Sequence, residues 1–474
     1  MDSLTAQRRV RSRKRFLLAA MGCAGGMVLF DQTVVAVALT PMARDLGLDA
    51  AAMYRVVLIY VLSLSSLAAV VGMIARRFGF LRTVQCGVVL FAAASACCGL
   101  TPPGETAEPF ILVARAVKGA GAALMLSVAT AVITDVHVAH ERGKALAVYA
   151  AYAQIFLVMG PVAGALLTHV FGWRSVFLVN VPVSAAILWM LTQARLPKRA
   201  QGGDVAVLQA VLVVLALVVF VFGLFQSGAW GLQDARTITF VSAGLLLLAL
   251  SAWVVLRSRR PILDLRLMKL RAFAVAVALT FLVQAGQLSL LVHAALHLQQ
   301  VQHLSVVTSG AMLLALVVPL AAGTYLSGRL RDHFGSARAA TVLGLACGTA
   351  GVAAWTSALA SDNAYGQIPG MLAAGLGMGM PIPALSAEMM NSVPDEARTD
   401  ASVLRQTLRQ MGGAFGLAVI GAVALTSNDR TANGAGVFTG SATVAGFIGA
   451  GVFLTLAFVL ALTMLPRHTE RFAA

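Results

Sequence analysis

Two acidic side chains stand where the surrounding sequence is strongly apolar. Asp31 lies inside the run LFDQTVVAVAL (Leu29–Leu39), and Glu388 lies near the end of a later apolar run. A charge at the depth of a bilayer costs roughly 2.5–3.5 kcal/mol, so such a side chain should face a cavity or an opposite charge. A partly desolvated carboxylate in that position can bind and release a proton, which is the chemistry of a proton relay.

Arg115 is the predicted partner of Asp31. Asp31 lies about nine residues from the outer end of its predicted helix, roughly 13 Å at 1.5 Å per residue. Arg115 lies about six or seven residues from the outer end of the fourth predicted helix, roughly 10 Å. The two side chains can therefore meet at one depth. Their pairing indicates either proton coupling or substrate contact, or else a static ion pair that fixes helix packing.

Two arginines form a second candidate cluster with Glu388. Arg405 and Arg409 are four residues apart and therefore share one face of a helix. Glu388 ends the preceding predicted helix near the inner side of the membrane. We expect the two arginines to pair with Glu388, either as an inner latch or as a purely structural ion pair.

Apolar helices must position these side chains. Of the 474 residues, 59% are hydrophobic and only 11% are charged. Runs of about 20 apolar residues, each long enough to cross a bilayer, recur from end to end. We predict an all-α polytopic membrane protein with fourteen spans, at roughly 16–40, 54–74, 82–100, 109–134, 144–168, 174–193, 204–227, 236–256, 272–296, 306–328, 338–359, 366–390, 402–426 and 441–465.

The net charge is +16, and the basic residues behind it are distributed as the predicted topology requires. If the N-terminus lies in the cytoplasm, the inner segments hold most of the 35 Lys and Arg residues, and the outer segments hold Arg44, Arg55, Arg174, Arg236 and Arg430. This is the positive-inside pattern, and it predicts that both termini are cytoplasmic. Because topology explains the charge, we expect no nucleic-acid partner.

An internal repeat predicts two related halves. GMIARRFGFLR (Gly72–Arg82) and GRLRDHFGSAR (Gly328–Arg338) share Gly, an aliphatic residue, Phe, Gly and Arg at the same offsets. Each copy occupies a short turn between two predicted spans. Repeats of this kind build two halves around a central site. We predict a six-helix bundle over residues 1–195, a linker with an inserted two-helix hairpin over 196–260, and a second six-helix bundle over 261–474.

Five stretches carry a more specific pattern: DQTVVAVAL (Asp31–Leu39), GMIARRFG (Gly72–Gly79), RAVKGAGAA (Arg115–Ala123), GPVAGALL (Gly160–Leu167) and GWRSVFLVNVPV (Gly172–Val183). Together they resemble the fourteen-helix drug:proton antiporters of the major facilitator superfamily, the Emr/Qac-type exporters. The resemblance implies a major facilitator fold and export of amphipathic organic compounds in exchange for protons. A dedicated exporter of one metabolite or of a self-made antibiotic is the alternative.

The resemblance also implies roles for particular residues. Gly160, Pro161 and Gly164 match the antiporter motif, which implies exchange without a leak path. The two repeat loops match a cytoplasmic gating loop, whose candidate residues are Gly72, Arg76, Arg77, Gly79, Gly328, Asp332, Gly335 and Arg338, joined by Arg405 and Arg409. The chain departs from the family pattern in having Arg76 for Asp, Lys118 for Gln and Arg55 for Trp.

Six polar residues are candidates to line the central cavity: Gln32, Lys118, Gln154, Gln284, Gln287 and His293. Each glutamine, and His293, could instead make a hydrogen bond between helices. The run GLGMGMPIPA (Gly375–Ala384) predicts a kinked helix, which either lines the second half or serves packing alone. Because Lys118 and Arg55 add positive charge, we expect poorer handling of dicationic compounds than of neutral or anionic ones.

The sequence offers no other source of energy or catalysis. It has no phosphate-binding loop and no catalytic cluster, so we expect no enzyme activity and no cofactor, with a proton gradient as the energy source. Its five cysteines are not spaced like metal ligands, and we expect no metal site. The expected partners are small organic substrates, protons and lipids of a bacterial inner membrane, and a periplasmic adaptor is left open.

Overall fold

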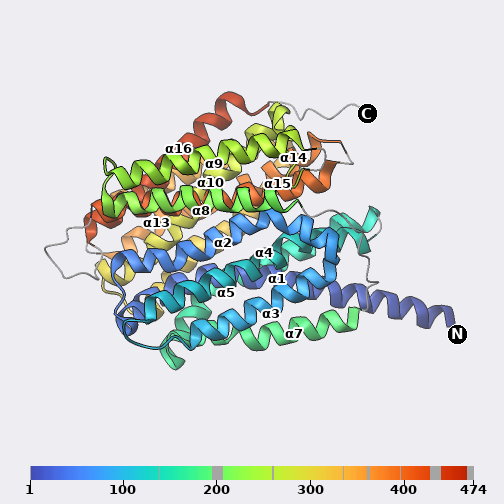
Figure 1. Ribbon diagram of the computed structural model, residues 1–474, viewed down its shortest axis with the longest axis horizontal. Helices are drawn as coiled ribbons and strands as arrows, with labels where there is room; N and C mark the ends of the chain where they lie inside the picture. Colours follow the sequence, from blue (N-terminus) through green and yellow to red (C-terminus); the bar gives the residue numbers. More distant parts are fainter. Residues whose placement is uncertain are drawn as a thin grey trace.

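The computed structural model describes residues 2–137, 139–194, 206–258, 261–334, 336–359, 363–394, 397–427 and 439–466 (Figure 1). All regular elements in these ranges are helical. Fourteen helical segments are long and apolar enough to cross a membrane, which confirms the predicted number and the all-α class. Residues 195–205 lie outside the described ranges, so the predicted domain boundary at 195/196 stays a prediction.

The first half of the molecule contains seven helices that form six spans, because α6 and α7 continue one another. Its elements are α1 (Asp2–Leu46), α2 (Ala50–Phe78), α3 (Phe80–Gly99), α4 (Ala107–Val136), α5 (Ala139–Phe171), α6 (Ser175–Leu178) and α7 (Asn180–Ala194). Local sequence sets the limits of α2. The Asp49 side chain accepts the backbone N–H of Ala52 at the start, and Gly79 ends the helix with φ 93°, a conformation that favours glycine.

A hairpin of two helices, α8 (Val207–Trp230) and α9 (Ala235–Arg257), precedes the second half. The second half comprises η1 (Leu265–Lys269), α10 (Arg271–Leu296), η2 (His297–Val301), α11 (Val306–Phe334), α12 (Ala337–Ala358), η3 (Ala364–Gln367), α13 (Ile368–Gly379), α14 (Pro381–Asn391), α15 (Arg398–Thr426) and α16 (Gly440–Met464). The two halves meet along α2 against α15 and along α5 against α11. The hairpin packs through α8 on both α15 and α2.

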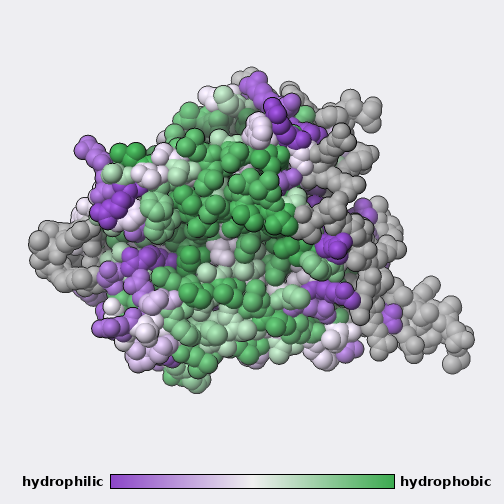
Figure 2. Space-filling model, viewed as in Figure 1, coloured by the Kyte–Doolittle hydropathy of each residue, from purple (hydrophilic) through white to green (hydrophobic). Residues whose placement is uncertain are grey.

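The distribution of hydrophobic residues on the surface is that expected of a membrane-spanning molecule. Hydrophobic residues cover the middle of the face in Figure 2, and hydrophilic residues gather toward its two ends. Helix α1 begins and α16 ends at the same end of the bundle, on the right of Figure 1. We call this the terminal end, and we call the opposite end, where α1 meets α2, the far end.

The glycines of the run Gly375–Ala384 serve close helix packing. A Cβ atom on Gly375 would lie 2.1 Å from the Leu316 carbonyl oxygen of α11, and one on Gly377 would lie 2.0 Å from the Gly348 nitrogen of α12. The helix is interrupted between α13 and α14, since Pro381 has no N–H to continue it. The kink is therefore as predicted, and of the two alternatives these contacts favour packing.

Candidate functional site

The Asp31 carboxylate lies between two cations of α4. The Arg115 guanidinium donates from Nη1 to Asp31 Oδ2 at 2.7 Å, and the Lys118 ammonium donates to Asp31 Oδ1. Arg115 and Lys118 are three residues apart and therefore lie on one face of α4. The structure thus brings together Asp31 and Arg115, as their depths predicted. It also places Lys118 in this ion triad, where the sequence suggested a cavity residue.

The triad is sealed inside the first half. Asp31 and Lys118 have no exposed surface, and Arg115 is 1% exposed. Arg115 Nε also donates to the Val56 carbonyl oxygen of α2 at 3.1 Å. Aromatic rings complete the enclosure, since the Tyr60 ring lies 4.2 Å from Arg115 and the rings of Phe91 and Phe177 lie 4.7 and 4.9 Å from Lys118 Nζ. Such desolvated cation–π contacts stabilise the two cations in a site whose net charge is positive.

The antiporter-motif residues connect the Asp31 helix to the second half. A Cβ atom on Gly160 would lie 1.7 Å from Thr33 Oγ1, and one on Gly164 would lie 3.1 Å from Val34 Cα, so α5 touches α1 just beyond Asp31. On its other side, α5 contacts α11, where a Cβ atom on Gly310 would lie 2.6 Å from the Pro161 carbonyl oxygen. A displacement of α1 near Asp31 would therefore also move α5 and change its contact with α11 at the boundary between the halves.

Hydrogen bonds join the two halves at the far end. His293 Nδ1 lies 2.8 Å from the Ser289 carbonyl oxygen, which can only accept, so Nδ1 carries the ring proton. The Tyr54 hydroxyl of α2 therefore donates to His293 Nε2, at 2.5 Å. In η2, Gln299 Nε2 donates to the Val37 carbonyl oxygen of α1 at 2.9 Å. His293 thus makes a hydrogen bond between helices, which is one of the two alternatives for it.

We expect Tyr54→Phe to loosen the far end. The change removes the hydroxyl that donates a hydrogen bond to His293. A typical buried hydrogen bond contributes about 1 kcal/mol to stability. Val37 is fully buried in this contact. A membrane-impermeant maleimide should label Val37→Cys about fivefold faster in the Tyr54→Phe background than in one with Tyr54 intact, when the native cysteines are removed from both. Tyr365→Phe, at an exposed tyrosine, is the control. An unchanged labelling rate would contradict the proposed contact.

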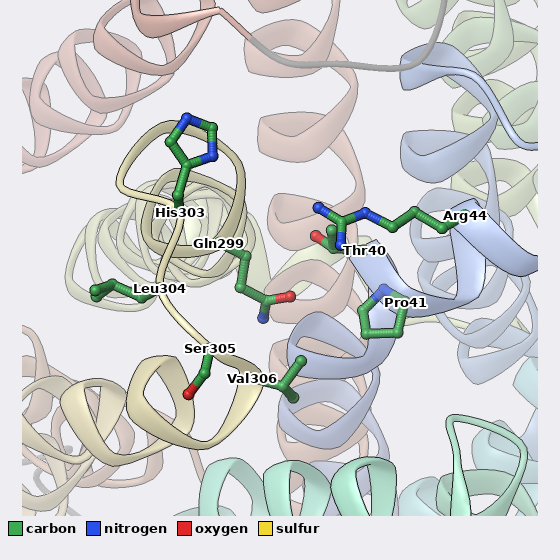
Figure 3. A pocket seen from close by; sticks show the side chains of 8 residues that line it. All are labelled: Thr40, Pro41, Arg44, Gln299, His303, Leu304, Ser305 and Val306. Atoms are coloured by element: carbon green, nitrogen blue, oxygen red, sulfur yellow. The ribbon is translucent and has the colours of Figure 1, made fainter.

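A small pocket lies beside these contacts, at the junction of the two halves (Figure 3). It has a volume of about 240 Å³ and is lined by Thr40, Pro41, Arg44, Gln299, His303, Leu304, Ser305 and Val306. Its residues come from the far end of α1, from η2, and from the segment that leads from η2 into the first residue of α11. The buried Gln299 Oε1 has no hydrogen-bond partner in the part of the chain that the structure describes.

Among the described residues, neither arginine forms the predicted ion pair with Glu388. Arg405 Nη1 donates to Ser386 Oγ at 3.1 Å, and Arg409 Nε donates to Gln284 Oε1 at 2.8 Å. Ser386 and Glu388 are two residues apart on α14 and therefore point to nearly opposite sides of the helix. Because Ser386 faces α15, the buried Glu388 is turned away from it.

The loop residues at the terminal end have different surroundings in the two halves. Arg76 interacts electrostatically with Asp400 of α15, across the boundary between the halves. Arg338 instead donates to the carbonyl oxygens of Leu462 and Leu465 at the end of α16, at 2.7 and 3.0 Å. Asp332 is exposed, and its 3.5 Å contact with the adjacent Arg331 is a surface pair of little energetic value.

The remaining loop candidates make few contacts with the other half. Arg77 is exposed, and a Cβ atom on Gly72 would lie 3.9 Å from Val403 Cγ1 of the other half. Gly328 has open space around its Cα, and Gly335 lies outside the described residues. The gating roles of all these residues stay predictions.

The predicted cavity glutamines divide into two groups. Gln284 makes a helix–helix hydrogen bond with Arg409, which is one of the two alternatives for it. Gln32 Nε2, Gln154 Oε1 and Gln287 Oε1 are buried and have no partner among the described residues. They come from α1, α5 and α10, three helices at the boundary between the halves. Each of these amides therefore has one buried atom that the described residues leave without a hydrogen bond.

Comparisons with known proteins agree with this architecture. The chain is 31% identical over 464 residues to the puromycin resistance protein of Streptomyces alboniger, covering 94% of this chain and 90% of the relative. It is 27% identical over 410 residues to the multidrug resistance protein Stp of Mycobacterium tuberculosis, covering 86% and 75%. The fold is similar to the crystal structure of a D-xylose–proton symporter, with a TM-score of 0.68, 14% identity, and coverage of 96% and 98%. The family model of the Major Facilitator Superfamily matches residues 21–417, and the chain therefore belongs to this superfamily.

Proposed function

We propose that the chain is a proton-coupled exporter of amphipathic organic compounds. The observation that carries the proposal is the buried Asp31 carboxylate between Arg115 and Lys118. Ionisable groups enclosed at membrane depth are costly and mark proton relays in transporters. The printed names of the two relatives, a multidrug and a puromycin resistance protein, support an organic compound as the cargo.

The triad provides a way to couple protonation to movement. When Asp31 takes up a proton, it no longer balances the charges of Arg115 and Lys118, which are then two buried cations without a counter-charge. Their repulsion and desolvation favour a rearrangement of α1 against α4. Helix α5 packs on α1 at Thr33 and on α11 at Gly310, so it transmits that rearrangement to the second half. Release of the proton on the other side of the membrane restores the triad.

The proton gradient supplies the energy in this scheme. It provides about 1.4 kcal/mol per pH unit, and the membrane potential adds about 2.3 kcal/mol per charge per 100 mV. The terminal end lies in the cytoplasm of a bacterial cell, which the distribution of Lys and Arg between the two ends supports. The substrate is taken from that side and released at the far end.

Export of a single compound is the second candidate. The name of the puromycin resistance protein supports it, whereas the name of the multidrug resistance protein supports a broad range. Substrate range, not mechanism, separates these two candidates.

Everted vesicles that contain the chain test both candidates. We expect them to take up several chemically unrelated amphipathic dyes, and a proton ionophore should abolish this uptake. Vesicles from the same cells without the chain are the control. Ionophore-sensitive uptake of one compound alone would favour the dedicated exporter. Uptake of no dye from a broad panel, or uptake that the ionophore does not affect, would overturn the proposal.

A further inference from the structure

Two arginines of α15 carry charge that no described carboxylate neutralises. Arg405 donates to the Ser386 hydroxyl, and Arg409 donates to the Gln284 carboxamide, and both of these partners are neutral. Each guanidinium has five N–H groups, so most of them remain for another partner. The two side chains are half-buried.

Both arginines lie at membrane depth. They follow the start of α15 at Arg398 by seven and eleven residues, roughly 10 and 16 Å along the helix axis at 1.5 Å per residue. Both fall inside the span Asp400–Thr426. A lone cation at such a depth is costly, and intramembrane charges of this kind face a water-filled cavity, a counter-charge or a ligand.

The arginines lie on a face of α15 that packs on α10 and borders α2. Gly413 is one turn after Arg409 on that face, and a Cβ atom there would lie 3.1 Å from Leu288 Cδ2 of α10 and 3.8 Å from Val61 Cγ1 of α2. Both guanidinium groups also lie within electrostatic range of the Tyr149 hydroxyl of α5. They therefore reach the boundary between the halves, where transporters of this architecture bind their cargo.

The two described acidic residues at this depth, Asp31 and Glu388, do not pair with these arginines. Asp31 is enclosed by Arg115 and Lys118 inside the first half. Glu388 lies on the other side of α14 from Ser386, which is the residue that contacts Arg405. The boundary region near α15 is therefore positively charged. On α10, one turn from Gln284, the Gln287 carboxamide oxygen has no hydrogen-bond partner among the described residues.

We propose that Arg405 and Arg409 bind an acidic group of the exported compound, a carboxylate or a group of similar chemistry. The inference rests on the proposed function and names its substrate class. The planar guanidinium matches a carboxylate with two parallel N–H···O bonds, and charge-assisted bonds of this kind are stronger than neutral ones. A dicationic compound would instead meet two like charges without a counter-charge.

A matched pair of probes tests the charge preference on purified wild-type protein. Dansyl-phenylalanine carries a carboxylate, and dansyl-phenylalaninamide has the same ring system without the charge. Fluorescence anisotropy in nanodiscs gives the dissociation constant of each probe. We expect the acid to bind at least about tenfold more tightly than the amide, which corresponds to about 1.4 kcal/mol. Equal affinities, or no binding of either probe, would overturn the inference.

Variants of Arg405 and Arg409 then test whether these two residues cause the preference for the acidic probe. Arg405→Gln with Arg409→Gln should weaken binding of the acid by at least about tenfold and change binding of the amide by less than about twofold. Arg236→Gln, at an exposed arginine of α9, is the matched control and should change neither. An equal loss for both probes would overturn the inference. The dye uptake assay is independent of these measurements, so failure of the substrate class and failure of export are distinguishable.

Discussion

Replacing Asp31 with Asn should destabilise the protein strongly and abolish coupled export. The change removes the carboxylate that both Arg115 and Lys118 contact, and it leaves two cations buried in a ring of aromatic side chains. Removing one partner of a buried ion pair costs about 3–5 kcal/mol. Thermal unfolding of the purified protein, followed by fluorescence, should show a large decrease in Tm together with a lower abundance in the membrane.

A second substitution separates stability from coupling. Asp31→Asn with Lys118→Met has the same net charge at this site as the wild type, since one negative and one positive charge are removed together. We expect Tm to recover by most of the loss, whereas ionophore-sensitive export should stay absent. If Asp31→Asn alone unfolds at the wild-type temperature, the buried triad described above is contradicted.

Gly160→Ala should be the second most damaging change. The added methyl group would lie 1.7 Å from Thr33 Oγ1 and 2.7 Å from Thr33 Cβ, so α5 and α1 would have to separate beside Asp31. Overpacking of this kind costs about 1–3 kcal/mol, occasionally more. Thermal unfolding should therefore occur at a lower temperature, and export should fall because α5 also packs on α11.

The same helix offers the control for this change. Gly143 has open space around its Cα, so Gly143→Ala should raise the stability of α5 by up to about 1 kcal/mol. Thr33→Ala should partly rescue Gly160→Ala, because in the described part of the chain the Thr33 hydroxyl bonds only to carbonyl oxygens of its own helix, those of Leu29 and Phe30. Equal unfolding temperatures for Gly160→Ala and Gly143→Ala would contradict the close contact of α5 with α1.

The features that follow from local patterns could be predicted from the sequence. Apolar run length gives the number of spans, and the depths of Asp31 and Arg115 along their helices indicate that they can meet. The contact of Lys118 with Asp31 was not predicted, because Lys118 was considered only as a polar candidate for the central cavity. Its spacing of three residues from Arg115 already placed both cations on one face of α4.

The features that depend on how helices dock could not be predicted. The sequence suggested that Glu388 meets Arg405 and Arg409, but the rotation of α14 about its axis directs Ser386 toward Arg405, and Arg409 contacts Gln284 of α10. The bond between Tyr54 and His293 joins residues 239 positions apart. It exists because the two halves meet at the far end, and no local pattern in either helix contains that information.

Gradient-driven transport in proteoliposomes is the measurement that tests the assignment of the coupled proton to Asp31. Wild-type protein and the Asp31→Asn, Lys118→Met variant would be reconstituted at equal density, with a fluorescent substrate from the dye panel and an imposed pH gradient. Wild-type protein should accumulate the substrate beyond equilibrium and reverse direction when the gradient is reversed. The folded variant should bind the substrate and only equilibrate it across the membrane. Accumulation by the variant at the wild-type level would contradict the assignment and place the proton on another group.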